Sequence, residues 1–230
     1  MASAALWLLI GNSRWHWARG RANELDCWSE APPDPGQRPQ ALEAGHPLRG
    51  WGAVGPLPGP VPWLNPTSRL ESGAVPLADL PAWVGLDRAL VGWRAWQLTG
   101  GPVLVADVGT ALSLTLVDGG GRFAGGRIQA GRALQLRALA SGTVLLPEVQ
   151  GFRDRPLHAD SPWPRETAAA LEHGVCEGLV AAVARAWDQA RRDRPDCRLW
   201  ITGGDGDWLA HSLGQPCHSN LALEALAALS

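Results

Sequence analysis

Residues 107–110 (DVGT) have the residue types of a phosphate-binding turn. They follow the apolar run 102–107 and precede the alternating run 112–117, so the pattern predicts a turn between two strands. A glycine lets backbone N–H groups approach an anion closely, and a threonine hydroxyl adds a donor. An aspartate at a strand end can hold a cation that offsets phosphate charge. An ordinary hairpin with a capping aspartate has the same local pattern, so both interpretations stay open at this point.

Two further segments combine glycine with polar residues. Residues 85–88 (GLDR) open a predicted helix over 87–98, where a carboxylate beside a guanidinium suits a general base next to an anion-binding group. The alternative is a capping aspartate with a surface arginine. Residues 202–205 (TGGD) follow a predicted strand over 198–202. They suit either a turn beneath a nucleotide or a helix entry capped by Asp205.

The composition excludes several classes of protein. All 20 basic residues of the 230 are arginine, which excludes the lysine-bearing phosphate loop and Schiff-base enzymes. The net charge of −2 and the scattered arginines argue against a nucleic-acid binder. The four cysteines form no CxxC pair, which argues against a zinc ribbon. The apolar run 4–10 is too short to span a bilayer, so we expect a cytoplasmic protein with no membrane partner.

Strands and helices are predicted to alternate along the chain, which indicates an α/β protein. The Pro-rich segment 56–66 suits either a linker or a packed loop. Residues 8–13 and 105–110 resemble each other, because each is an apolar strand followed by a glycine turn with a hydroxyl residue. This repeat indicates a duplicated α/β unit. The predicted strands are 6–10, 14–19, 51–54, 102–107, 112–117, 123–129 and 198–202, and the predicted helices are 37–44, 87–98, 132–140, 167–190 and 221–229.

Seven motifs in sequence order resemble those of the type III pantothenate kinases. Residues 9–13 (LIGNS) resemble the first phosphate motif, DxGN[TS], with leucine in place of its aspartate. Residues 85–88 are similar to GxDR, and residues 107–111 are similar to the second phosphate motif, DxGTA. The remaining motifs are 125–131 (GGxIxPG, with Ala130 where proline is usual), 143–147 (TAxLP), Thr167 with Gly174 and Gly178, and 202–204 (TGG). The order of all seven, over nearly the whole chain, makes the resemblance specific.

The resemblance implies a fold and an assembly. The fold is a duplicated actin-like (ribonuclease H-like) kinase fold, with two lobes and a cleft. Residues 1–86 would form the N-terminal lobe and residues 87–230 the C-terminal lobe, with the last helix returning to the first lobe. The resemblance also implies a homodimer with its substrate sites close to the subunit interface.

The resemblance further implies an activity, namely ATP-dependent phosphorylation of pantothenate to 4'-phosphopantothenate, the first step of coenzyme A biosynthesis. Asp87 would be the catalytic base, and Asp107 would bind a monovalent cation, potassium or ammonium. Magnesium would accompany ATP. The residues implied to bind pantothenate are Gly85, Leu86, Asp87, Arg88 and Thr167. Those implied to bind ATP are Leu9, Ile10, Gly11, Asn12, Ser13, Arg14, Trp15, His16 and Thr110.

Leu9 is the main departure from the family pattern, because the aspartate at this position helps to hold magnesium through water. Asn12, Ser13 and Asp107 could still hold a hydrated ion, since magnesium often takes only one or two carboxylates. The departure leaves two alternatives open. One is a catalytically impaired, kinase-like protein that binds ligands or regulates, and the other is a kinase of a different small alcohol.

Overall fold

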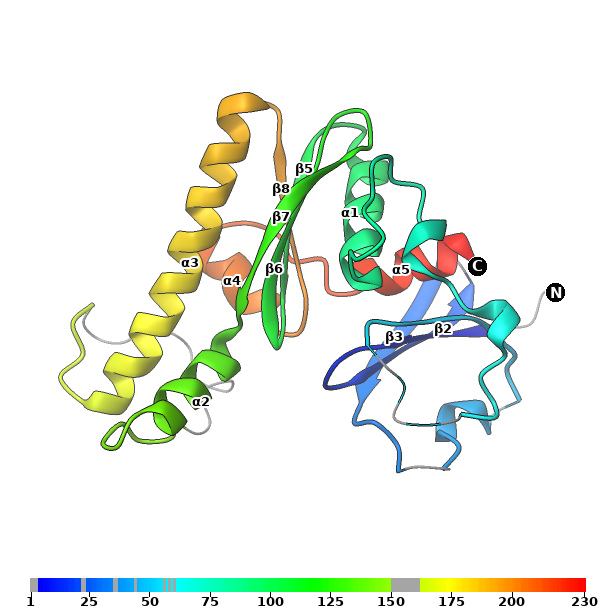
Figure 1. Ribbon diagram of the computed structural model, residues 1–230, viewed down its shortest axis with the longest axis horizontal. Helices are drawn as coiled ribbons and strands as arrows, with labels where there is room; N and C mark the ends of the chain where they lie inside the picture. The colour runs from blue at the N-terminus through cyan, green and yellow to red at the C-terminus, as the bar shows by residue number, and fades with distance from the viewer. Residues whose placement is uncertain are drawn as a thin grey trace. The chain divides into compact units, whose positions relative to one another are not determined.

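The computed structural model contains two four-stranded sheets with the same internal order (Figure 1). It describes residues 4–21, 24–34, 37–43, 45–55, 57, 59, 61–149 and 162–230. The sheet orders are β3-β2-β1-β4 and β7-β6-β5-β8. In each sheet the first strand of the repeat, β1 (Ala5–Ile10) or β5 (Val103–Val108), lies between its hairpin partner and a later strand. The duplication predicted from the two glycine turns is therefore confirmed.

The chain divides into two compact units. Unit 1 comprises Met1–Val103, Thr115–Gly125 and Asn220–Ser230, and unit 2 comprises Leu104–Leu114 and Gly126–Ser219. The lobe boundary expected between residues 86 and 87 stays a prediction.

The first sheet has β1 at its centre. Its other strands are β2 (Trp15–Arg21), β3 (Glu24–Glu30) and β4 (Leu48–Ala53). Strand β1 pairs antiparallel with β2 and parallel with β4, and every residue of β1 is buried. Burial on both faces explains why its sequence is continuously apolar rather than alternating. The helix α5 (Leu221–Leu229) contacts β1 and β4, and it also packs against α1 (Leu86–Thr99).

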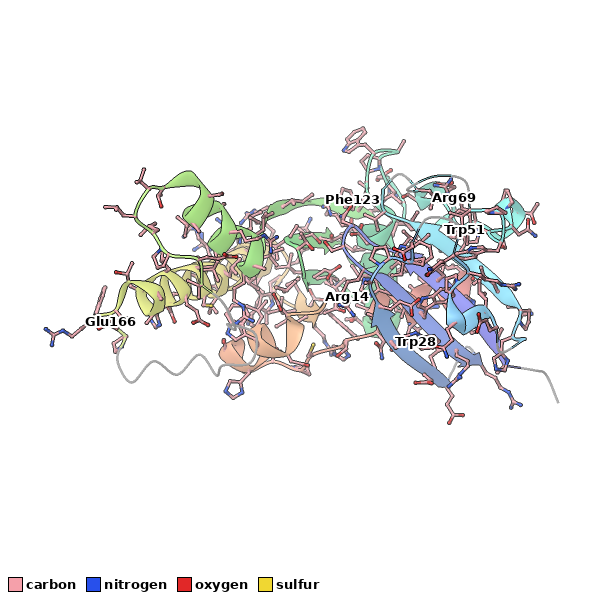
Figure 2. The ribbon with its side chains drawn as sticks, turned by 90° about the horizontal axis from the view of Figure 1, so that it is seen from below. Arg14, Trp28, Trp51, Arg69, Phe123 and Glu166 are labelled. Carbon is pink, nitrogen blue, oxygen red and sulfur yellow. The ribbon has the colours of Figure 1, made fainter. Side chains whose placement is uncertain are left out.

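Tryptophan side chains fill the core on one face of the first sheet. Trp17 stacks on Trp28 with ring centroids 6.2 Å apart. Trp51 donates its indole N–H to the backbone oxygen of Asn65 at 2.8 Å, and the Arg69 guanidinium lies 5.2 Å from the Trp51 ring (Figure 2). The side chains from the Pro-rich segment that pack on this core are Leu57, Val61, Trp63 and Leu64. The described part of 56–66 is therefore a packed loop, and residues 56, 58 and 60 lie outside the described residues.

The second sheet contains β6 (Ala111–Val117), β7 (Phe123–Ala130) and β8 (Arg198–Thr202) beside β5. Only two residues separate β5 from β6, so these neighbours form an antiparallel hairpin. Unit 2 also contains the helices α2 (Arg132–Gly142), α3 (Thr167–Asp193) and α4 (Gly206–Leu213), and α3 contacts both others. The helix α3 is the one described helix that is long and apolar enough to cross a membrane. It buries one face containing Val175, Leu179 and Val183, although only 22% of its most apolar stretch is buried inside the structure.

Three elements differ from the sequence predictions. The helix predicted over 37–44 is wrong, since the structure has a single 3-10 turn, Gln40–Leu42, that buries only Leu42. Pro39 and Pro47 flank this segment, and proline limits helix extension. Strand β3 was not predicted because Glu and Asp interrupt its apolar residues. The helix α4 was not predicted because its eight residues are too few for a clear periodicity.

Candidate active site

The turn between β1 and β2 presents three polar side chains in unit 1. The Gly11 N–H donates to the Arg14 backbone oxygen at 3.0 Å, which closes the turn. A Cβ at position 11 would lie 2.9 Å from that same oxygen, so the turn requires glycine. The side chains of Asn12, Ser13 and Arg14 are exposed. The turn therefore offers an amide, a hydroxyl and a guanidinium from a closed backbone loop.

The flanking residues of this turn are held inside unit 1. Leu9, Ile10 and Trp15 are buried, so they can reach a ligand only through their backbone atoms. His16 is half-buried, and its Nδ1 lies 2.7 Å from Ser29 Oγ. Burial, with a smaller contribution from the Arg14 charge, lowers the pKa of His16. His16 is therefore neutral at neutral pH, and the positive charge of the turn comes from Arg14.

Leu9 lies in the core of the first sheet. Its side chain is 4% exposed, and it pairs with His16 in β2 and Gly52 in β4. The missing aspartate of the first motif is thus replaced by a core residue, and not by another exposed ligand.

Asp87 lies in the first turn of α1. The helix begins after Gly85, so Asp87 is not its N-cap, and the capping interpretation is wrong. Asp87 Oδ1 accepts the Arg88 N–H at 2.8 Å. Burial raises the pKa of the Asp87 carboxyl, while the Arg88 N–H and charge oppose this shift. A half-buried carboxylate with a raised pKa is a better proton acceptor than an exposed one.

Arg88 is fixed by contacts with the second sheet. Its Nε donates to Thr115 Oγ1 at 3.3 Å, and its guanidinium lies 5.6 Å from the Phe123 ring centroid. Figure 2 labels Phe123 in this region. Burial lowers the pKa of Arg88, but a guanidinium stays charged in proteins. Sequence reasoning missed Thr115, because nothing in an alternating strand marks which threonine will face an arginine.

The residues that follow β4 bring the glycine turn and the Asp87 motif together. A Cβ at Gly55 would lie 3.4 Å from Asn12 Oδ1, and a Cβ at Gly85 would lie 3.9 Å from Val54 Cγ1. Strands β1 and β4 are parallel, so both motifs gather at the carboxyl ends of adjacent strands. Open α/β sheets bind ligands at this edge. Leu86, in contrast, is buried against Gly52 and belongs to the core.

In unit 2, two glycines pack directly on the turn 107–110. A Cβ at Gly203 would collide with the Val108 backbone oxygen and lie 2.5 Å from Asp107 Oδ1. Gly203 also has φ of 96°, which side chains rarely adopt. A Cβ at Gly131 would collide with the Gly109 backbone oxygen. Gly131 and Gly203, about 70 residues apart in sequence, thus both pack on the turn 107–110.

Three side chains of unit 2 that the sequence singled out are at least partly accessible. Asp107 is half-buried at the end of β5, Thr110 is exposed in the turn, and Thr167 is exposed at the first position of α3. Asp205 precedes α4 as its N-cap but makes no capping side-chain hydrogen bond, because its carboxylate is paired with Arg132. Arg132 was not singled out from the sequence, where it is one of many helical arginines.

Across the described ranges, no three His, Cys, Asp or Glu side chains gather to form a metal site. Within the described ranges, fewer than three such side chains would therefore be available to a bound metal. Asp107, the next-to-last residue of β5, lies beside Gly203, and its role as a metal ligand stays a prediction.

Comparisons with known proteins identify the family of this chain. The family model described as Type III pantothenate kinase matches residues 61–189. This chain belongs to the type III pantothenate kinase family. A type III pantothenate kinase of Synechococcus elongatus (strain ATCC 33912 / PCC 7942 / FACHB-805) is 36% identical over 222 residues, covering 90% of this chain and 86% of that protein. Another, from Synechococcus sp. (strain JA-2-3B'a(2-13)), is 43% identical over 159 residues, covering 69% of this chain and 61% of that protein.

Solved structures confirm the actin-like fold. The ethanolamine utilization protein EutJ from Carboxydothermus hydrogenoformans superposes with a TM-score of 0.54 at 10% identity, covering 100% of this chain and 91% of that chain. The activator of the 2-hydroxyisocaproyl-CoA dehydratase from Clostridium difficile, with bound ADPNP, superposes with a TM-score of 0.50 at 11% identity. That match covers 98% of this chain and 94% of the activator. At such low identity the likeness concerns the fold alone.

Proposed function

We propose that this chain transfers the γ-phosphoryl group of ATP to the primary hydroxyl of pantothenate, producing 4'-phosphopantothenate for coenzyme A biosynthesis. Family membership supports the reaction class and the acceptor. The observation that carries the proposal is the half-buried Asp87 carboxylate, whose pKa is raised by burial, at the same sheet edge as the glycine turn 11–14.

Asp87 accepts the hydroxyl proton in the proposed mechanism. Its Oδ1 is occupied by the Arg88 N–H, so we assign the proton to the other carboxylate oxygen. Arg88 binds the carboxylate of pantothenate, and its contacts with Thr115 and Phe123 limit the orientations of the guanidinium. Gly85 and Leu86 contribute backbone atoms to pantothenate binding in unit 1. In unit 2, the exposed Thr167 hydroxyl is a further proposed contact with pantothenate.

The turn 11–14 of unit 1 binds the phosphates of ATP through its backbone N–H groups and exposed side chains. In unit 2, the exposed Thr110 is a separate proposed contact with ATP. Phosphoryl transfer depends on positioning and charge neutralisation more than on covalent chemistry. The chain has no lysine, so the protein's share of the positive charge comes from arginines such as Arg14 and from backbone dipoles.

The donor set fits a monovalent cation at Asp107 and a magnesium ion carried largely by ATP. Asn12 and Ser13 are exposed and can contact the waters of a hydrated ion, whereas the buried Leu9 cannot. Magnesium keeps several waters and needs few protein ligands, so this reduced set is sufficient. When bound, the ion neutralises charge on the transferred phosphoryl group.

We further propose a cytoplasmic homodimer. Unit 2 exposes Val144, Leu145 and Trp163 to 98%, 90% and 84%, and an apolar surface of this kind is typical of an interface. All four cysteines are free thiols, as expected in a reducing compartment. Light scattering of the purified protein measures the oligomeric state, and a monomer at micromolar concentration would contradict the dimer.

The test of the main proposal is a measurement of ADP release with purified protein, ATP and pantothenate, with the phosphorylated product identified by mass. A panel of other small alcohols tests whether pantothenate is the preferred acceptor. The replacement of the motif aspartate by Leu9 favours one alternative, a protein that binds nucleotide without turnover. Nucleotide binding with no phosphorylation of any acceptor would establish that alternative and refute the kinase.

A further inference from the structure

A buried ion pair links two elements of unit 2 that sequence motifs do not connect. Arg132 Nη2 lies 3.8 Å from Asp205 Oδ1, and the two side chains are 3% and 4% exposed. Arg132 is the first residue of α2, and Asp205 directly precedes α4. Arginine and aspartate are almost never this buried unless they are paired, because desolvation of each charge is costly.

Both members of the pair adjoin backbone groups that hold the turn 107–110. The Asp205 N–H donates to the Val108 backbone oxygen at 2.9 Å. On the other side of Gly109, the N–H of Gly131, the residue before Arg132, donates to the Thr110 backbone oxygen at 2.9 Å. The ion pair therefore joins the two segments that hold the turn from either side of its glycine.

The surroundings of Arg132 restrict where its guanidinium can lie. The Trp208 ring of α4 lies 5.1 Å from the guanidinium carbon. The Cys176 thiol of α3 is also close to Arg132, since burial raises the pKa of Cys176 to about 11 while Arg132 opposes that shift. Residues of α3 and α4 thus surround Arg132 at the beginning of α2.

Stability alone is a weak reason for such a pair. Apolar residues of similar volume can replace buried ion pairs with little loss, and often with a gain, in stability. A buried pair of opposite charges does, however, favour one placement of its two side chains, which apolar side chains would not.

We propose that Arg132 and Asp205 are positioning residues for the nucleotide site, which fix the turn 107–110 relative to residues 203–205. The inference rests on the proposed function, in which Thr110 contacts ATP. Neither residue touches the reacting atoms, and the pair acts through the two backbone hydrogen bonds to the turn.

The first experiment replaces Arg132 by methionine and compares the two substrates. We expect Arg132→Met to raise the KM for ATP, and the Kd for ADP measured by calorimetry, at least ~10-fold, because small displacements of positioning groups are costly. The KM for pantothenate should stay within about twofold, which is close to the error of such comparisons. Arg191→Met is the matched control, since Arg191 is exposed and lies 5.3 Å from the Trp187 ring, and it should change neither constant.

A second variant keeps the test decisive if Arg132→Met does not fold. Arg132→Met/Asp205→Leu removes both buried charges, so it should fold, and its circular dichroism spectrum and melting temperature report this. We expect the double variant to bind ADP as weakly as the single one. Wild-type affinity for ADP in a folded double variant, or an equal rise of KM for both substrates, would overturn the proposal.

Calorimetry separates this proposal from the proposed function. If the wild-type protein binds ADP but phosphorylates no pantothenate, the assigned activity fails while the positioning role is still tested by ADP binding. If Arg132→Lys, which keeps the charge, restores more than about half of the lost ADP affinity on a logarithmic scale, the charge matters more than the planar fork. If Arg132→Lys recovers none of the lost ADP affinity, the geometry of the guanidinium is required. Both results agree with positioning, provided that Arg132→Met weakens ADP binding.

Discussion

Replacing Asp87 by asparagine isolates the proton-accepting role from the structural role of the carboxyl group. Asparagine has nearly the same shape, and its Oδ1 can still accept the Arg88 N–H that Asp87 Oδ1 accepts at 2.8 Å. The first turn of α1 should therefore keep its geometry. What the variant loses is the ability to take a proton from the acceptor hydroxyl.

The expected loss of activity is therefore the contribution of the proton acceptor alone. A positioned general base contributes roughly 10²–10⁴ to the rate, so we expect kcat to fall at least ~100-fold, or about 2.7 kcal/mol in the barrier. KM for pantothenate should change little, because Arg88 is retained and keeps its contact with Thr115.

The Asp87→Asn substitution should lower kcat, but it should not lower the stability of the folded protein. Burial raises the pKa of Asp87 above its ordinary value of 3.8, so the folded protein favours the neutral carboxyl. The stability contributed by this neutral form is complete below the ordinary pKa and is lost as the pH rises through the raised pKa. An asparagine side chain does not ionise and has no such loss, so the Asp87→Asn variant should be at least as stable as the wild type at neutral pH.

The assay measures ADP release between about pH 4 and pH 8, the range over which a shifted carboxyl titrates. Wild-type kcat/KM should rise with pH as Asp87 ionises. This acidic limb of the pH profile should be absent from Asp87→Asn. Asp79→Asn is the matched control in the same unit, since Asp79 is exposed and pairs with Arg122 at 2.7 Å. Retention of more than about a third of the wild-type kcat in Asp87→Asn, or persistence of the pH limb, would refute the assignment of the base.

Three other substitutions, with Gly204→Ala as a control for the first, test the glycine turns and the cation sites. Gly203→Ala should lower the free energy of unfolding by about 1–3 kcal/mol, because φ is 96° there and a Cβ would meet the Val108 oxygen. Gly204→Ala, where a Cβ meets nothing within 4 Å, should cost less in the same urea titration, and equal losses would contradict the close-packing argument. Asp107→Asn should abolish activation by potassium, and an unchanged potassium titration would exclude Asp107 as its ligand. Leu9→Asp should lower the magnesium concentration that gives half-maximal rate, at a cost in melting temperature because Leu9 is buried, and no shift in that concentration would show that the motif aspartate is dispensable here.

The sequence by itself determined the repeated strand–glycine turn–strand pattern, the position of Asp87 at the beginning of a helix and the family. These features are local. Apolar residues recur at every second position in a strand and about every 3.6 positions in a helix, and a glycine before a polar residue marks a turn. Each of these patterns can be recognised within about ten residues. The order of the seven motifs then indicated the family, which no single motif could do. Local pattern also explains the failures, since the helix predicted over 37–44 lies between prolines and forms only the turn Gln40–Leu42.

The tertiary structure alone decided which side chains are buried and which segments meet. Asn12 lies beside Gly55, and Gly85 of the Asp87 motif lies beside Val54, although each motif is far from residues 54–55 in sequence. In the sequence Arg132 is one helical arginine among many, yet the structure buries it in an ion pair. Burial of a charge depends on what the rest of the chain packs around it, and this information is spread over contacts between distant residues.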